Sequence, residues 1–271
     1  MIESLLLATK FTRQSVAALE RALLLMPGHA DRIGVLHVVD PDVSVALVLG
    51  VGGSPPPILT EWLDVRLPEG LARPEVLIRK GDPHSEILAT ADARDDDLIV
   101  LGSSRPQGLL AGLRGSTIER VLRGGTRPVL SVRQPPQGPY WRILIASDLS
   151  GSSGFAAQTA LRLGLLRDAR IHLVHAVDDE AGAEVGQAEA ELRAFAARSD
   201  IGLPDGIEVS VLAGSPQTAL RSAMDGLAPD LVILGTGGHS GLRRLVLGSV
   251  AEDLLAWLPV DVLVVPPEPE M

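Results

Sequence analysis

This sequence of 271 residues contains no cysteine, which excludes disulfides, thiolate metal sites and cysteine nucleophiles together. Aromatic residues make up only 3% of the chain and hydrophobic residues 46%, so the core must be built from aliphatic side chains. Lysine is nearly absent too, since Lys10 and Lys80 are the only two among 24 basic residues. The length suits two domains of ordinary size.

Positive charge is also scarce, because the formal net charge is −10 and no Lys/Arg cluster stands clear of acids. Nucleic-acid binding needs a basic face to neutralise phosphates, so we expect no nucleic-acid partner. The start, MIESLLLATK, carries Glu3 and only a short apolar run, so neither a signal peptide nor a membrane span is expected. These features predict a soluble, cytoplasmic protein without a membrane partner.

The chain consists of two copies of one unit. ESLLLATKFT aligns with WRILIASDLS, and VLHVVD with LVHAVD, both at an offset of 138 residues. Three later blocks align at an offset of 133: RKGDPHSEIL with LAGSPQTAL, DDLIVLGSS with PDLVILGTG, and a Gly-Ser pair in each copy. The offset changes once, where a connecting segment tolerates a difference in length.

A linker, QPPQGP at 134–139, separates the copies, because proline and glycine at this density cannot continue a helix or a central strand. We therefore predict two domains, over residues 1–134 (the first half) and 140–271 (the second half).

Each half alternates apolar runs with helical patterns. Continuously apolar runs are typical of parallel strands covered by helices on both faces. In the first half they lie at 5–8, 33–39, 98–101 and 129–132. Helical spacing appears at 15–26 and 188–199, whereas 40–70 is expected to hold a loop and then a short helix from Ile58. Five strands with right-handed crossovers in each half predict an α/β fold of two doubly wound, five-stranded parallel sheets. Ligands of such sheets bind at the carboxyl ends of strands where the strand order reverses.

A glycine-spaced loop, GTGGHSGLRRLVLGS at 235–249, follows the fourth apolar run of the second half. Gly235, Gly238 and Gly248 would let a phosphate approach backbone N–H groups, and the helix that Ser249 opens offers free N–H donors and partial positive charge.

The Gly-Ser pair alone is better explained by helix capping. The capping box S-x-x-E occurs in both halves, at Ser249 and Glu252 and at Ser116 and Glu119. The full spacing, after a strand and before a helix, favours phosphate binding, and a dinucleotide fingerprint is excluded because it would follow the first strand.

With these motifs the chain resembles the universal stress protein family in its tandem form, over nearly all of both halves. The specific element is Gly-x-x-Gly-x9-Gly-Ser/Thr, which the second half matches in full. The resemblance implies an adenine nucleotide alpha hydrolase-like fold, a stress-response or signalling function, and ATP as the ligand, with Mg²⁺ or Mn²⁺ held through its phosphates. It also implies pairing of the last strands, 129–132 and 262–265, which a tandem chain can form internally as a pseudo-dimer. Whether two chains then associate as a homodimer, and which protein is the partner, stay open.

The same resemblance assigns the ATP site to the second half. Asp148, at the end of the first strand, would contact the nucleoside, and Ala176 would contact adenine through its backbone. The residues expected to bind the nucleotide are Ala146, Ser147, Asp148, Ala176, Gly235, Thr236, Gly238, His239, Gly248, Ser249 and Val250. From the residues alone, a structural role for Asp148, as a helix N-cap or an exposed turn acid, is as well supported as a contact with the nucleoside. His37 and His175, inside apolar runs, are expected to be buried and hydrogen-bonded rather than ligands.

The first half departs from the family pattern twice. Lys10 occupies the position of Asp148, and Arg105-Pro106 replaces Gly238-His239. The reversed charge, the added side chain and the lost N–H donor oppose binding of ATP in the usual way. Three readings of Lys10 and Arg105 remain open: they hold a different anion, they pair with nearby acids, or they plug the site.

Two other functions compete with non-catalytic ATP binding: a slow ATPase or phosphotransferase, and an interaction scaffold without a nucleotide. No Walker-type lysine follows the glycines and no acid pair is dedicated to magnesium, so no catalytic or metal-ligating residue is expected. The intact second motif argues against a scaffold that has lost nucleotide binding.

Overall fold

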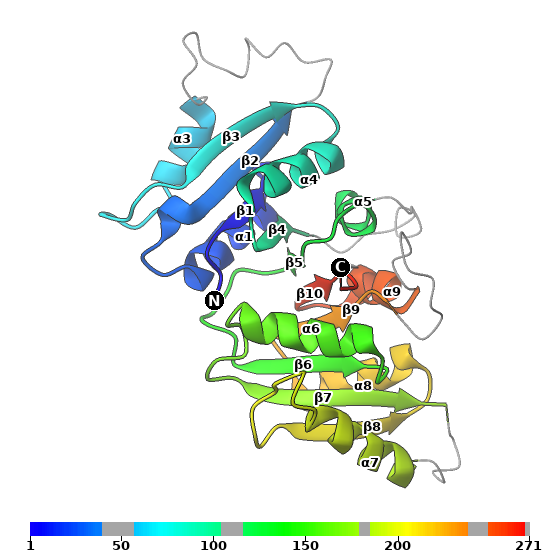
Figure 1. The fold of residues 1–271 in the computed structure, drawn as a ribbon. Helices are drawn as coiled ribbons and strands as arrows, with labels where there is room; N and C mark the ends of the chain where they lie inside the picture. The colour runs from blue at the N-terminus through cyan, green and yellow to red at the C-terminus, as the bar shows by residue number, and fades with distance from the viewer. Residues whose placement is uncertain (40–56, 104–115, 179–184, 238–248, 269–271) are drawn as a thin grey trace.

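The computed structural model describes residues 1–39, 57–103, 116–178, 185–237 and 249–268. Ten strands in these ranges form one sheet in the order β3-β2-β1-β4-β5-β10-β9-β6-β7-β8 (Figure 1). The first half contributes β1 (Leu5–Ala8), β2 (Ile33–Val39), β3 (Glu75–Lys80), β4 (Leu98–Gly102) and β5 (Val129–Val132). The second half contributes β6 (Arg142–Ser147), β7 (Arg170–Val177), β8 (Glu208–Ala213), β9 (Leu231–Gly235) and β10 (Asp261–Val265).

Helices cover both faces of this sheet, as the continuously apolar strands predict. Four described helices pack on one face: α1 (Arg13–Leu25), α3 (Pro57–Asp64), α6 (Gly151–Arg162) and α7 (Val185–Ala196). Four pack on the other: α4 (Pro83–Arg94), α5 (Thr117–Gly124), α8 (Pro216–Leu227) and α9 (Ser249–Trp257). A short 3₁₀ helix, η1 (Ala30–Arg32), precedes β2.

The expected elements are confirmed where the structure describes them. Each half has five strands, and the strand order reverses between β1 and β4 and between β6 and β9, which defines a doubly wound sheet. Helices α1 and α7 overlap most of the two segments with helical spacing but end before residues 26 and 197–199, and α3 is the short helix expected near Ile58. Residues 40–56 of the expected loop lie outside the described residues.

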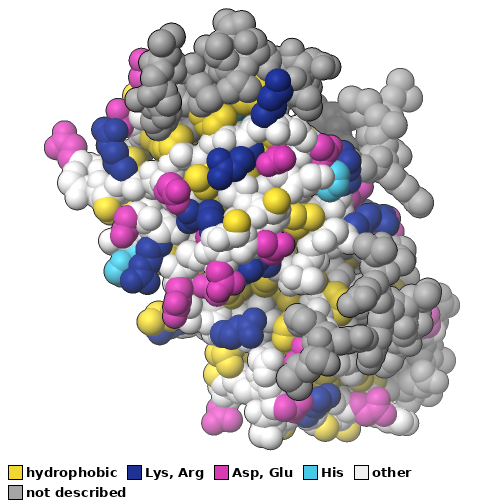
Figure 2. All heavy atoms as spheres, turned by 45° about the horizontal axis from the view of Figure 1, so that its top comes forward, with side chains coloured by type: hydrophobic (Ala, Val, Ile, Leu, Met, Phe, Trp, Pro, Cys, Tyr) yellow, Lys and Arg dark blue, Asp and Glu magenta, His cyan; other side chains and the backbone are white. Residues whose placement is uncertain are grey.

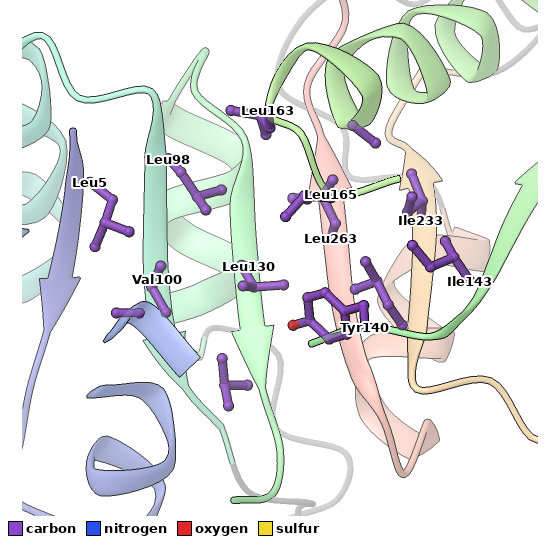
Figure 3. Packing of buried hydrophobic residues seen from close by; sticks show 14 of the residues in the cluster. Leu5, Leu98, Val100, Leu130, Tyr140, Ile143, Leu163, Leu165, Ile233 and Leu263 are labelled. Atoms are coloured by element: carbon purple, nitrogen blue, oxygen red, sulfur yellow. The ribbon is translucent and has the colours of Figure 1, made fainter. Parts of the chain in front are cut away.

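The two halves meet at β5 and β10, which pair antiparallel while all other neighbours are parallel. Leu263 lies opposite Leu130 in this register. Both side chains are fully buried and belong to a hydrophobic cluster with members from both halves, among them Tyr140 and Leu165 (Figure 3). Burial of apolar surface therefore continues across the junction.

A buried polar cluster fixes the same junction. Asp261, at the start of β10, is only 4% exposed, and Arg21 of α1 is 5% exposed. The Asp261 carboxylate accepts hydrogen bonds from Arg21 Nε at 3.1 Å, from the Tyr140 hydroxyl at 2.7 Å and from the backbone N–H of Arg133 at 2.9 Å. Arg21 Nη1 donates to the carbonyl of Gly138 at 2.8 Å, and its guanidinium lies 3.9 Å from the centre of the Tyr140 ring. The cluster thus ties α1, the linker and β10 together.

On the other face, α5 and α9 meet across the junction through Arg123, which pairs with Glu252. The sequence predicts a capping box between Glu252 and Ser249. In the structure, Oε1 of Glu252 is directed to Arg123 in the first half. In the first half, Ser116 Oγ accepts from the backbone N–H of Glu119 at 3.2 Å, so the expected capping by Ser116 is confirmed.

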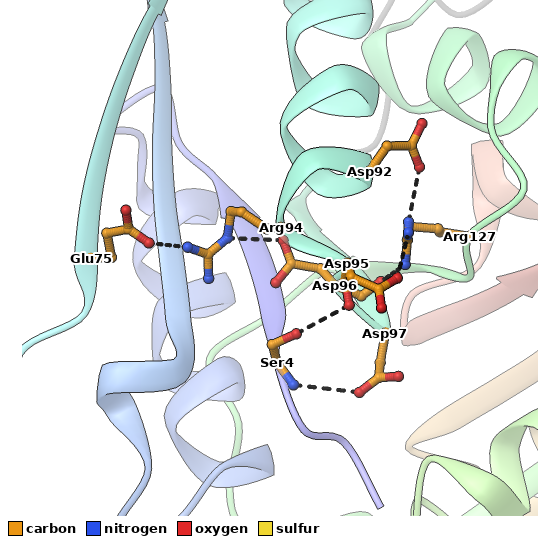
Figure 4. Close-up of polar contacts among 8 residues, drawn as sticks. All are labelled: Ser4, Glu75, Asp92, Arg94, Asp95, Asp96, Asp97 and Arg127. Carbon is orange, nitrogen blue, oxygen red and sulfur yellow. Dashed lines mark hydrogen bonds and ion pairs between the residues drawn. The ribbon is translucent and has the colours of Figure 1, made fainter.

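Acids and arginines form a second polar network at the amino ends of β1, β3 and β4 (Figure 4). Arg94 pairs with Asp96 at 3.0 Å and with Glu75, and Arg127 holds Asp92 and Asp95 at 3.0 Å each. Burial raises the pKa of Asp96 above 3.8, although Arg94 acts in the opposite direction. This network occupies the edge of the sheet opposite to the carboxyl ends, so it serves the fold and not the candidate site.

Arg21→Ala and Asp261→Ala should each lower the free energy of unfolding by about 3–5 kcal/mol, because each leaves a buried charge without its partner. The double variant should lose less than the sum, since the two residues are in contact. Urea unfolding measures all three. Arg198→Ala, which breaks an exposed ion pair with Asp200, is the control and should leave the unfolding midpoint nearly unchanged. Equal midpoint shifts for Arg198→Ala and Arg21→Ala would contradict this assignment.

The stability of the junction should also depend on pH. Burial raises the pKa of Asp261 above 3.8, although its hydrogen bonds with Arg133, Tyr140 and Arg21 act in the opposite direction. Between the ordinary and the raised pKa the folded protein binds more protons than the unfolded chain, so the free energy of unfolding falls as pH rises. The stability advantage of the wild type over Asp261→Asn should therefore be largest at the acid end of this window. A constant difference in urea midpoint from about pH 4 to 7 would be inconsistent with a raised pKa.

Candidate functional site

Neighbouring strand ends define a candidate site in the second half. The order β7-β6-β9 places the carboxyl ends of these three strands side by side, where the strand order reverses. Ser147 ends β6, Gly235 ends β9, and Ala176 is the penultimate residue of β7. Of the residues expected at the site, those from 146 to 148 therefore lie at the same edge of the sheet as Ala176, Gly235 and Thr236.

The turn between β6 and α6 orients Asp148. Leu149 adopts a left-handed conformation with φ of 63°, which is unusual for a residue other than glycine. Asp148 Oδ1 accepts hydrogen bonds from the backbone N–H of Ser150 at 3.1 Å and from its hydroxyl at 2.5 Å. Ser150 is the N-cap of α6 and accepts from the N–H of Ser153. The N-cap reading of Asp148 is therefore wrong, and the half-buried carboxylate is held at the end of β6.

Hydroxyl groups spaced three residues apart support this turn, and sequence reasoning missed them. Ser147 Oγ lies 2.9 Å from Ser153 Oγ and accepts from the N–H of Leu149 at 3.0 Å. In the first half, Thr9 Oγ1 accepts from the N–H of Phe11, whose φ is 59°. The two sets are Thr9, Thr12 and Ser15, and Ser147, Ser150 and Ser153. Their equal spacing in the aligned segments is a signal that could have revealed the shared turn.

A histidine on the second strand of each half holds the end of the first strand. His175 Nδ1 lies 2.8 Å from the carbonyl oxygen of Ser147, and His37 Nδ1 lies 2.9 Å from that of Thr9. A carbonyl only accepts, so Nδ1 carries the proton in both rings. The expected hydrogen bonding is confirmed, but both histidines are half-buried and not buried as expected.

Gly235 is required by packing between strand and helix. A Cβ atom there would lie 2.7 Å from the carbonyl oxygen of Ser152, in the first turn of α6. At the matching Gly102, an added Cβ would lie 2.3 Å from the carbonyl oxygen of Gln14 in α1. The backbone N–H of Thr236 donates to the carbonyl of Val265 at 3.0 Å, so it extends the sheet. Packing against α6 is thus sufficient to explain a glycine at position 235, and its expected role in phosphate approach stays a prediction.

The other expected phosphate contacts are only partly described. Gly238, His239 and Gly248 lie outside the described residues. Ser249 and Val250 form the first turn of α9, and their side chains are not described.

In the first half, the matching edge of the sheet holds a pocket of about 100 Å³ that includes Lys10 and Thr117 in its lining. Lys10 and β4 are neighbours as expected, because β1 pairs with β4. Arg105 and Pro106 lie outside the described residues. Lys10 Nζ lies 3.4 Å from the hydroxyl of Thr117, and no ion pair joins Lys10 to an acid among the described residues.

Surface charge and metal ligands add little to the site. Basic and acidic side chains alternate on the face shown in Figure 2, with no field of one sign. Within the described ranges no three His, Asp or Glu side chains gather as metal ligands. Nor does any helix in these ranges combine the length and the apolar character that crossing a bilayer requires.

The family follows from comparison with known proteins. The sequence model of the Universal stress protein family matches residues 1–133 and again residues 139–266. The chain therefore belongs to the universal stress protein family and carries two of its domains in tandem.

Curated relatives and solved structures agree with this membership. A universal stress protein of Synechocystis is 30% identical over 174 residues, which cover 62% of this chain and 58% of the relative. A putative universal stress protein of Staphylococcus haemolyticus is 28% identical over 139 residues, covering 46% of this chain and 84% of the relative. The crystal structure of a universal stress protein from Archaeoglobus fulgidus superimposes with a TM-score of 0.68 at 22% identity, covering 97% of this chain and 98% of the other. That of a putative universal stress protein from Pseudomonas aeruginosa gives 0.70 at 20% identity, with 98% and 94% covered. At these identities the structures establish the fold alone.

The two described glycines at the end of β9 should respond differently to substitution. Gly235→Ala should lower the free energy of unfolding by about 1–3 kcal/mol, because its Cβ would meet the backbone of Ser152. Gly237→Ala would place a Cβ only 2.3 Å from Ser152 Oγ, a side-chain atom. Ser152→Ala should therefore rescue Gly237→Ala but not Gly235→Ala. Urea unfolding of the three single and two double variants tests this, and rescue of both would mean that α6 shifts to accept a Cβ at Gly235.

Proposed function

We propose that this chain is a cytoplasmic ATP-binding protein of stress response or signalling, with one competent nucleotide site in its second half. The observation that carries the proposal is the turn after the first strand, which both halves build in the same way. Leu149 and Phe11 have φ values of 63° and 59°. The side chain just before them is Asp148 in one half and Lys10 in the other. A carboxylate accepts hydrogen bonds from sugar hydroxyls, whereas an ammonium only donates.

In this proposal the phosphate contacts come from the C-terminal part of the glycine motif. Gly235 is already required by contact with α6, and the N–H of Thr236 is used by β10. Gly238, Gly248 and the N-terminus of α9 are then the parts of the motif that would face the phosphates. Free N–H donors and the helix dipole at that terminus favour an anion. Mg²⁺ or Mn²⁺ would be bound through the phosphates and not by a cage of protein ligands.

The first half acts, in this proposal, as a built-in partner of the second. The antiparallel β5·β10 pair and the Arg21–Asp261 contact join the halves. Covalent linkage raises the effective concentration of each half for the other, so the pair would form as an internal pseudo-dimer without a bimolecular cost.

The proposal predicts one bound ATP per chain, which Asp148→Lys or Gly238→Arg should remove. These substitutions copy two differences of the first half into the second, so each should lower nucleotide affinity by at least about tenfold. Mass spectrometry of nucleotide released from the purified protein gives identity and stoichiometry, and titration with ATP gives the affinity.

Two controls separate a local effect from a general one. Asp205→Lys reverses an exposed acid before β8 in the same half and should leave ATP binding unchanged. Lys10→Asp should leave the stoichiometry at one, because Arg105-Pro106 remains in the first half. Retention of ATP by both Asp148→Lys and Gly238→Arg would show that the site is assigned wrongly.

A further inference from the structure

The pocket of the first half has apolar walls and a polar rim. It lies at the carboxyl ends of β1 and β4, beside the N-termini of α4 and α5. The walls come from aliphatic side chains of the sheet and of these helices: Leu36, Val38, Ile87, Leu101 and Ile118. Lys10, Thr12 and Thr117 contribute polar atoms to the lining. Its volume of about 100 Å³ is smaller than the cavity of about 150 Å³ that binds one benzene ring, so it suits a ligand part of a few carbon atoms.

Lys10 brings a positive charge to this pocket that no described acid compensates. Its ammonium contacts the Thr117 hydroxyl at 3.4 Å, and the side chain is exposed. Asp82, the N-cap of α4, is already bound by Arg120 at 3.0 Å and by His84. Thr117 is also the first residue of α5, where the helix dipole favours an anion. An anionic head group therefore suits the rim.

We propose that this pocket binds a short aliphatic monocarboxylate. The carboxylate would lie between Lys10 and Thr117, and the chain would lie among the aliphatic walls. One ammonium offsets one negative charge, which matches a carboxylate better than a phosphate dianion or a triphosphate. The small volume selects a chain of a few carbons, and the absence of a carboxylate at position 10 removes the group that would receive a nucleoside.

The scarcity of lysine permits a direct test with butyrate as the probe. Reductive methylation with ¹³C preserves the lysine charge and labels Lys10, Lys80 and the terminal amine. Lys80→Arg assigns the two lysine signals. Butyrate should shift the Lys10 signal saturably and leave the Lys80 signal in place. A Lys10 signal that does not move, or that moves equally with inorganic phosphate, would overturn the proposal.

Variants test the two parts of the pocket separately, with saturation-transfer NMR on the butyrate signals as the readout. Lys10→Gln should weaken butyrate binding by at least about tenfold, whereas Lys80→Gln, the matched control, should have no effect. Ala8→Leu should fill the pocket and abolish binding while the charge of Lys10 remains. Butanol, with the same chain and no charge, should bind equally weakly to the wild type and to Lys10→Gln.

The outcome is independent of the ATP site in the second half. Asp148→Lys should leave butyrate binding unchanged, and Lys10→Gln should leave bound ATP unchanged. A Lys10 signal that responds to ATP and not to butyrate would overturn both the carboxylate site and the single nucleotide per chain. Failure of the butyrate test alone would leave the ATP proposal standing. Unaltered thermal unfolding of the variants excludes loss of folding as the cause.

Discussion

The antiparallel pairing of β5 with β10 is the contact on which the arrangement of both halves depends. Without it, two parallel sheets would each expose an edge strand with unpaired backbone groups. The pairing buries Leu130 against Leu263, and the carboxylate of Asp261 fixes it by accepting from Arg21, Tyr140 and the backbone of Arg133. In the first half the position of Asp261 is taken by Pro128 at the offset of 133 residues. The two copies of the repeated unit are therefore joined by a contact that is not symmetric between them, and this contact specifies how the two halves pack together.

A second consequence of duplication is that the same backbone turn carries a negative charge, Asp148, in one half and a positive charge, Lys10, in the other. Hydroxyls spaced by three residues, a left-handed residue and a histidine on the next strand build the turn in each half. The charged side chain at this position adds contacts that differ between the halves. Asp148 accepts from Ser150, the N-cap of α6, whereas the Lys10 ammonium contacts Thr117. The two binding proposals rest on this difference in charge within a shared backbone turn.

The fold could be predicted in detail from the sequence, and the site only in part. Continuous apolar runs located the strands, and two alignment offsets located the repeat, because burial on both faces leaves a direct mark on composition. Gly235 shows the limit of such reasoning. A glycine after a strand is equally consistent with approach of a phosphate and with approach of a helix. Only the structure identifies the second reason, because a Cβ added at Gly235 would lie 2.7 Å from the carbonyl oxygen of Ser152. Asp148 was ambiguous in the same way until Ser150 proved to be the N-cap.

The sequence by itself determined the family, the duplication, the doubly wound sheet and the reversal of charge between Asp148 and Lys10, since these are properties of residue type and local order. Only the tertiary structure decided which contacts join the halves, because Arg21 and Asp261 are 240 positions apart and their pairing has no local signature. It also decided that Lys10 opens onto a pocket and forms no ion pair with a described acid. Which charged residues form ion pairs depends on distances between strands and helices, and the order of residues along the chain does not contain those distances.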